Sequence, residues 1–176
     1  MADYEAVNAV AAGSIEAING VAKSSAEGVN GATTPSSGAT QWALVGDDGS
    51  VGYAAHSDLT SWTTYTNEVN GKNYKTITYG KDGSGNPRWV IAWEDDDKEI
   101  QYSNDITDTS GWTDVNIDPD LALWDCSWGN NVWVAVGTMA NGAQVVYRST
   151  DGASWSAVDI SSLEGSPHLL STTVVK

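Results

Sequence analysis

The sequence predicts an all-β protein, in which three propeller-like, four-stranded antiparallel blades follow a mostly irregular N-terminal arm. Two recurring features support this fold class. Apolar strands that begin with tryptophan recur at spacings of 47 and 44 residues: W42-A-L-V-G, W89-V-I-A-W and W133-V-A-V-G. Each is followed by a polar turn that closes on a further tryptophan: Trp62, Trp112 and Trp155. A period of about 40 to 50 residues with several short strands per unit is typical of propeller blades.

The composition is compatible with this fold. The chain has 176 residues, 40% of them hydrophobic, with 9 Trp and no Phe. The large aromatic apolar surfaces therefore belong to Trp and Tyr. The polar groups of these side chains suit half-buried positions on strands and surfaces on which a sugar ring can stack. Cys126 is the single cysteine, so neither an internal disulfide nor a cysteine metal cluster can form, and the fold must rely on packing.

The charge of the chain argues against nucleic acid as a partner. With 23 Asp and Glu against 8 Lys and Arg, the formal net charge is -15, which repels phosphate backbones and anionic membranes. Solubility alone can explain this acidity, and the densest run, residues 95–97, is interpreted as a solvated turn. The first residues lack the pattern of a signal peptide, and no apolar stretch has membrane-spanning length. We expect synthesis in a cytoplasm without membrane insertion.

The first domain, residues 1–37, is predicted to be an arm built on an 11-residue repeat. Asn8, Asn19 and Asn30 stand in register in the repeat. Eleven residues make three helical turns, which raises the alternative of a coiled coil. The Asn-Gly pairs at the second and third positions argue for turns instead, and a helix is expected only up to about Ile18. The remainder should form short extended pieces that need a partner or copies of themselves, or else a flexible leader.

The arm also carries a resemblance. S14-I-E-A-I-N-G-V-A-K-S-S25 resembles the I-x-x-I-N-G-V-A repeats near the start of many tailed-bacteriophage virion proteins, including tail, fibre and capsid-surface components. It covers about a fifth of the chain. The resemblance implies an arm that docks a head domain onto other virion proteins, with four apolar residues as the docking candidates: Ile15, Ile18, Val21 and Val29.

The second domain, residues 38–176, is the predicted head. Gly-, Asp- and Asn-rich turns divide its middle unit into four strands, at 74–79, 88–93, 99–103 and 112–117. The third unit is divided likewise, at 121–128, 132–137, 144–148 and 155–159. The first unit offers three strands, at 41–45, 51–55 and 62–65.

A lone strand at 168–176 is expected to complete the first blade, as propellers close their rings. Three blades are fewer than the four that propellers typically need. The alternatives are a dimer with six blades, in which Leu169 to Val175 completes its own or a partner's first blade, a larger ring, or an open stack of sheets. Small bacterial and fungal lectins resemble this arrangement, which favours a homo-oligomer.

The repeated polar turn is interpreted as a structural device. S149-T-D-G-A-S-W155 resembles the Asp box of sialidase-like propellers, in which Ser and Asp side chains bond turn amides above a packed Trp. We assign Asp58, Asp105 and Asp151 to this turn. The Asp-to-Trp gap is four residues at the first and third turns and seven at the second, which indicates an insertion there.

The residues that enzymes of such folds use are not evident. Sialidases grip a carboxylate with three arginines, and this chain has only Arg88 and Arg148. No carboxylate pair stands in a recognisable glycosidase setting. His56 and His168 lack a spaced metal partner, and Cys126 is expected to be a buried strand residue. We therefore expect that the protein is not an enzyme and that it binds neither a metal ion nor a cofactor.

The sequence thus favours a bacteriophage virion structural protein, a capsid decoration or a tail or fibre component, located in the virion. The alternative is a carbohydrate-binding lectin or host-adhesion module that binds a host-surface glycan. The tryptophans of the inner strands, Trp42, Trp89 and Trp133, are expected in the core. Trp93 and Trp128 are the candidates for an exposed glycan platform.

Overall fold

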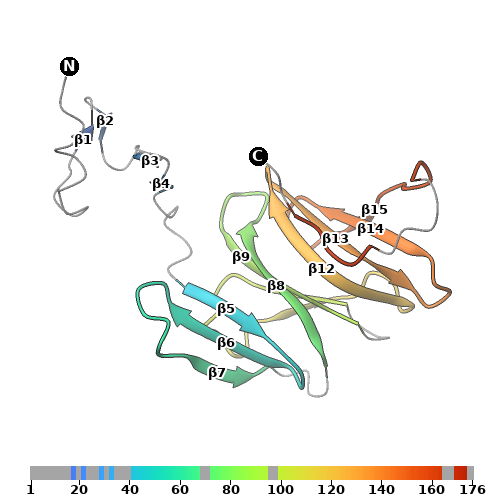
Figure 1. Cartoon of the computed structure of the whole chain (residues 1–176), viewed down its shortest axis with the longest axis horizontal. Helices are drawn as coiled ribbons and strands as arrows, with labels where there is room; N and C mark the ends of the chain where they lie inside the picture. The colour runs from blue at the N-terminus through green and yellow to red at the C-terminus, as the bar shows by residue number, and fades with distance from the viewer. Residues whose placement is uncertain are drawn as a thin grey trace. The chain divides into compact units, whose positions relative to one another are not determined.

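The computed structural model describes residues 17–18, 21–22, 28–29, 32–33, 41–67, 72–94, 99–163 and 169–173. It separates the chain into two units, Met1–Gly38 and Ala39–Lys176. The predicted all-β class is confirmed: the regular elements of these residues are all strands, and the second unit contains three antiparallel sheets of three or four strands (Figure 1).

The first unit contains two short antiparallel strand pairs. β1 (Ala17–Ile18) pairs with β2 (Val21–Ala22), and β3 (Gly28–Val29) pairs with β4 (Ala32–Thr33). Both strands of the first pair recur 11 residues later, so the sequence repeat is also a structural repeat. Residues 17 and 18 are therefore extended, and the helix expected before them falls on residues outside the described ones.

Each sheet of the second unit is a meander whose strands follow chain order. The first sheet consists of β5 (Gln41–Val45), β6 (Ser50–Ala55) and β7 (Thr63–Thr66). The second consists of β8 (Tyr74–Lys81), β9 (Pro87–Trp93), β10 (Ile100–Ser103) and β11 (Thr113–Val115). The third consists of β12 (Leu121–Gly129), β13 (Val132–Met139), β14 (Gln144–Ser149) and β15 (Ser156–Ala157). The ends of these eleven strands all lie within two residues of their predicted positions.

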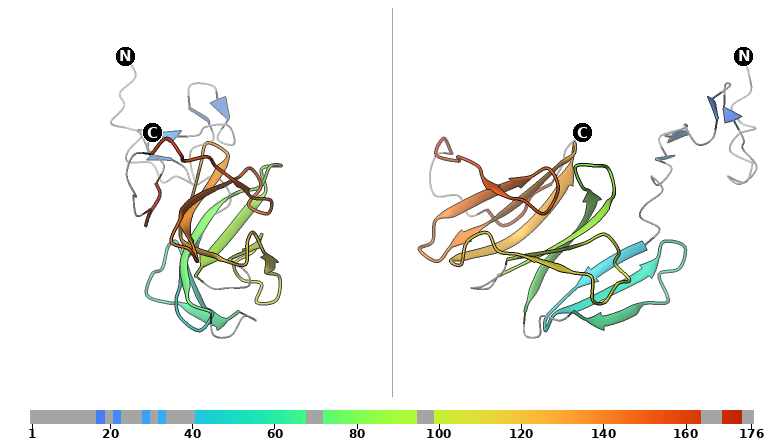
Figure 2. Two further views of the ribbon diagram at one scale, coloured as in Figure 1. Left: turned by 90° about the vertical axis from the view of Figure 1, so that its right-hand side faces the viewer. Right: turned by 180° about the vertical axis from the view of Figure 1, so that it is seen from behind.

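The second sheet lies between the other two, as adjacent propeller blades do (Figure 2). Its strand β9 is buried on both faces, because alternate side chains point to opposite neighbours. Val90 and Ala92 belong to the apolar core shared with the third sheet. Trp89, Ile91 and Trp93 belong to the core shared with the first sheet. One short strand therefore joins two hydrophobic cores.

A glycine on the innermost strand of the second sheet permits its close approach to the third. A Cβ on Gly80 would collide with the rings of Trp128 and Trp133. Nearby, the hydroxyl of Thr78 donates a hydrogen bond to the carbonyl oxygen of Cys126, with 2.5 Å between the oxygens. The innermost strands β8 and β12 are thus in direct contact.

The segment expected to complete the first blade does not do so within one chain, and this prediction needs correction. Residues 169–173 form no strand, and the first sheet has three strands. The segment lies against the third sheet, where Leu169 N donates to Gln144 Oε1 (2.8 Å) and Thr172 N donates to Asp125 Oδ2 (2.8 Å). The second sheet separates the third sheet from the first (Figure 1), so segment 169–173, which lies against the third sheet, does not reach β5 of its own chain.

Candidate functional site

The three aspartates assigned to turns each accept hydrogen bonds from residues close after them in the chain. Asp58 Oδ1 accepts from the amide and the hydroxyl of Thr60 (2.9 and 2.6 Å), and Asp105 Oδ1 accepts likewise from Thr107 (2.9 and 2.8 Å). The hydrogen bonds from the Thr60 hydroxyl and amide hold the pKa of Asp58 below its usual range. Each carboxylate is therefore committed to the local turn.

The third turn is the most densely bonded. Asp151 Oδ1 accepts from the amides of Ala153 (2.8 Å) and Ser154 (2.7 Å) and from the hydroxyl of Ser149 (2.9 Å). Partial burial by itself would raise the pKa of Asp151, but the hydrogen bonds from Ser154, Ala153 and Ser149 outweigh it and lower the pKa. The backbone of Gly152 at this turn has φ 74°, a conformation that favours glycine.

The insertion in the second turn adds a second aspartate turn and a buried apolar side chain. Asp108 Oδ1 accepts from the amide and the hydroxyl of Ser110 (3.0 and 3.1 Å). Asp108 stands four residues before Trp112, the same spacing as in the other two turns, and this spacing could have identified it from sequence. Ile106, between the two aspartates, is fully buried in the core of the first and second sheets.

Arg88 is a structural residue at the junction of the second and third sheets. Its Nε donates to Asn104 Oδ1 (3.1 Å) and its Nη1 donates to the carbonyl oxygen of Asp151. The guanidinium lies over the ring of Tyr102, 4.3 Å from the centroid, and 3.8 Å from a carboxylate oxygen of Asp82. The Arg88 guanidinium therefore connects the turns that contain Asp82, Asn104 and Asp151. Arg148, in contrast, is exposed on β14.

The proposed glycan platform of Trp93 and Trp128 is not present in the structure. Trp93 is fully buried and packs against Tyr74, with 5.3 Å between ring centroids. Trp128 is partly buried and packs against Trp133 at 6.2 Å. Both tryptophans lie on strands near the innermost edge, where a neighbouring sheet covers them, so neither presents a free face to a sugar.

Trp42, which the repeat places with the core tryptophans, is instead 51% exposed. Ala43 and Val45 point to the second sheet and pack against its core, so Trp42 and Leu44 lie on the opposite face of the first sheet. Trp89 and Trp133 are 6% and 0% exposed, because the same face of their strands is covered by the preceding sheet. The core prediction is correct for these two residues and wrong for Trp42.

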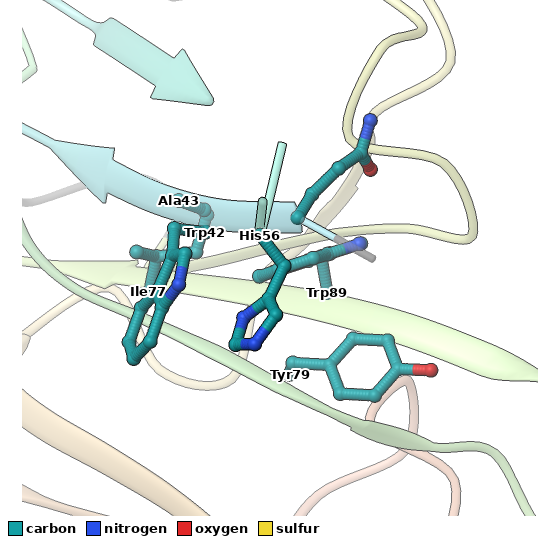
Figure 3. Close-up of a pocket in the computed structure, with 7 residues that line it drawn as sticks. Trp42, Ala43, His56, Ile77, Tyr79 and Trp89 are labelled. Atoms are coloured by element: carbon teal, nitrogen blue, oxygen red, sulfur yellow. The ribbon is translucent and has the colours of Figure 1, made fainter. Parts of the chain in front are cut away.

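A cleft of about 340 Å³ opens beside Trp42, and we name it the β5 cleft (Figure 3). Its lining comes from β5, from the residue after β6, and from β8 and β9: Gln41, Trp42, Ala43, His56, Ile77, Tyr79 and Trp89. The rings of Trp42 and His56 stack with 6.0 Å between centroids and 17° between planes. Tyr79 and Trp89 meet at 4.9 Å.

The polar groups of the β5 cleft suit binding of an extended chain or a ring hydroxyl. The hydroxyl of Tyr79 is buried and has no hydrogen-bond partner among the described residues. Burial raises the pKa of Tyr79, so this hydroxyl stays protonated and can donate. The side chains of Gln41 and His56 add an amide and an imidazole to the lining. The cleft therefore combines apolar walls with a few donors and acceptors, as binding sites commonly do.

The remaining predicted site residues have varied positions. Ile18 and Val21 are paired in the β1–β2 backbone register, and Val29 lies on β3. Ile15 and His168 lie outside the described residues. Cys126 is buried in the core of the second and third sheets, and burial raises the pKa of its thiol.

Across the described ranges, no group of three or more His, Cys, Asp or Glu could hold a metal ion. The same part of the chain contains no helix long and apolar enough to span a membrane.

Comparison with known proteins gives a structural likeness but no sequence relative. No family model matches the sequence, and no curated protein matches it. A solved structure described as YCF48 bound to D1 peptide is similar with a TM-score of 0.47 and 19% sequence identity. The match covers 65% of this chain and 36% of that one, so this chain spans about a third of the length of the solved protein.

Proposed function

We propose that the chain is a non-enzymatic structural component of a tailed-bacteriophage virion, in the capsid decoration or the tail, that displays its β head through the N-terminal arm. The I-N-G-V-A segment of the arm, which resembles virion protein repeats, coincides with the first strand pair. The repeat 11 residues later coincides with the second pair. This coincidence of motif and paired strands is the observation that carries the proposal.

The short strands of the arm suit a docking role. Each pair has two residues per strand, and a hairpin of that size is marginally stable in water unless further strands or a packing surface support it. A partner protein that offers such a surface would gain two similar contacts from one arm. The net charge of -15 favours a position on the particle surface over one against the packaged genome.

The proposal is tested with particles produced from a genome that encodes this chain. Mass spectrometry of purified particles should detect the full-length chain at a fixed copy number. The arm variant Ile18→Ser with Val29→Ser should be absent from particles while the head keeps its thermal unfolding temperature. Thr113→Ser, at an exposed position of β11 in the head, is the matched control and should be incorporated normally. Particles that lack the wild-type chain would refute the proposal.

Carbohydrate binding is the second candidate, and one observation favours it. The exposed ring of Trp42, stacked on His56 beside the β5 cleft, is a surface on which a sugar ring can stack. A glycan array probed with the folded full-length chain and with Trp42→Ser tests this role. Binding by the wild type that the variant loses would support it, and no binding by the wild type would remove it.

A further inference from the structure

We infer that copies of this chain assemble head to tail, with segment 169–173 of one copy added as the innermost strand beside β5 of the next. This assembly would occur in the isolated chain and does not depend on the virion proposal. Three features of the head support it: a repeated contact between innermost strands, the position of the β5 cleft, and the exposure of one face of the first sheet.

The repeated contact places segment 169–173 where the innermost strand of a fourth sheet would lie. Thr78 on β8 pairs in register with Val90, the residue after Trp89, and Ser127 on β12 pairs with Val134, the residue after Trp133. Thr78 and Ser127 are therefore equivalent positions in successive sheets.

These two hydroxyls donate equivalent hydrogen bonds, each to a backbone carbonyl of a segment later in the chain. The Thr78 hydroxyl donates to the carbonyl oxygen of Cys126 on the next innermost strand (2.5 Å), and the Ser127 hydroxyl donates to the carbonyl oxygen of Thr172 (2.7 Å). Asp125 adds two bonds to the segment, accepting from Thr172 N (2.8 Å) and from the Ser171 hydroxyl (2.9 Å). Segment 169–173 thus stands against the third sheet as β12 stands against the second.

The first sheet is the one that can use this strand. Its β5 carries the tryptophan that β9 and β13 carry, so β5 corresponds to the second strand of a four-stranded sheet. Within the described residues β5 pairs only with β6, which leaves its other edge open. The β5 cleft lies along that edge, between Ala43 of β5 and Ile77 and Tyr79 of β8. An added strand there would cover Ile77 and Tyr79, as β12 covers the other face of β8, and would offer backbone carbonyls to the Tyr79 hydroxyl.

The exposed face of the first sheet supports the same partner. Trp42 and Leu44 are 51% and 44% exposed, whereas the equivalent faces of the other two sheets are covered by a preceding sheet. The sheet that would cover them is the third sheet of another copy, on whose outer face segment 169–173 already lies. The two surfaces are different and lie on opposite sides of the second sheet (Figure 1), so the contact is heterologous and either closes into a ring or continues. Two copies with three sheets each would supply six blades, within the usual range for propellers.

The test is the native mass of the full-length chain at low micromolar concentration, by native mass spectrometry and light scattering. The wild type should give a multiple of the 18.5 kDa monomer mass, with a dimer expected for a closed ring. Thr172→Pro removes the amide N–H that donates to Asp125, and it also blocks strand pairing. Leu44→Arg places a charge on the exposed face of the first sheet, which would receive the other copy. Each variant should be monomeric. Thr113→Arg, on the exposed surface of β11, is the control and should keep the wild-type mass.

Mixing separates a head-to-tail contact from any other association. Thr172→Pro leaves the exposed face of the first sheet unchanged, and Leu44→Arg leaves segment 169–173 unchanged. An equal mixture should therefore form a dimer that contains one chain of each variant. Circular dichroism and thermal unfolding should show both variants folded. A monomeric wild type, variants that keep the wild-type mass, or a mixture that stays monomeric would each overturn the inference. Glycan binding by a monomeric wild type that Trp42→Ser abolishes would assign the cleft to a sugar instead.

Discussion

The indole nitrogen of Trp112 donates a hydrogen bond to the hydroxyl of Tyr65, with 3.0 Å between the two atoms. The same hydroxyl donates to the carbonyl oxygen of Ile106 at 2.8 Å. Tyr65 lies on β7 of the first sheet, and the other two residues belong to the inserted turn of the second sheet. Burial raises the pKa of Tyr65 to about 12, so its hydroxyl remains a donor across the neutral range. The insertion therefore fastens the outer strands of two sheets together.

Removal of this hydroxyl should destabilise the head. Tyr65→Phe deprives the Trp112 indole of its acceptor and the Ile106 carbonyl of a donor, and we expect a loss of about 1 to 3 kcal/mol of unfolding free energy. Tyr79→Phe is the control, and both changes are made in the monomeric Leu44→Arg background, because within one chain the buried Tyr79 hydroxyl has no partner among the described residues and its removal should be neutral or stabilising. Urea unfolding of both variants makes the comparison. Equal losses in the two would contradict the role given to the Trp112 contact.

The aspartate turns should make the protein sensitive to acid. Because the pKa of Asp151 is lowered in the folded state, its contribution to stability is complete above the ordinary value and is lost as the pH falls through the lower, folded value. Asp151→Ala should cost about 1 to 3 kcal/mol at neutral pH, since the amides of Ala153 and Ser154 lose their acceptor. Asp151→Asn keeps an acceptor oxygen and should cost less. Its unfolding free energy should also fall less steeply than that of the wild type below about pH 4, as measured by urea unfolding over a pH series.

Glu99 should have the opposite pH dependence. It is fully buried, its Oε2 accepts from the amide of Ile117 (2.8 Å), and burial raises its pKa above the ordinary value. A raised carboxyl pKa favours the folded state at low pH, and this advantage is lost as the pH rises through the folded value. Glu99→Gln keeps the acceptor without the charge, so it should be more stable than the wild type at pH 7 and lose that advantage near pH 4. A variant less stable than the wild type at pH 7 would show that the charge itself is needed.

The positions of the strands could be predicted because their signals are local. Short runs of apolar residues and the Gly-, Asn- and Asp-rich turns that bound them define where β9 or β13 begins and ends, whatever lies around them. The turn aspartates are local as well, and the spacing of four before Trp112 would also have identified Asp108.

Burial could not be predicted in the same way, since it depends on what covers each face. Trp42 and Trp89 are each followed by a short apolar run, yet their exposures are 51% and 6%. The strand of Trp89 is covered by the preceding sheet, whereas the strand of Trp42 has no sheet in front of it. Trp93 suits a platform only if β9 has a free face, and β9 has none. The β5 cleft was missed for the same reason, since it exists only where a strand would complete the first sheet.

The close contact between β8 and the third sheet leads to a final prediction, on Gly80. A Cβ at this position would overlap the rings of Trp128 and Trp133, which are themselves packed against each other and cannot easily move aside. Overpacking of a well-filled interior typically costs about 1 to 3 kcal/mol, so Gly80→Ala should lower the unfolding free energy by at least that amount. Gly83→Ala is the matched control from the adjacent turn, where the nearest atom to an added Cβ is 3.7 Å away. It should be neutral or slightly stabilising through the unfolded chain. Urea unfolding monitored by tryptophan fluorescence gives both values, and a Gly80→Ala variant as stable as Gly83→Ala would show that the second and third sheets do not approach as closely at this point.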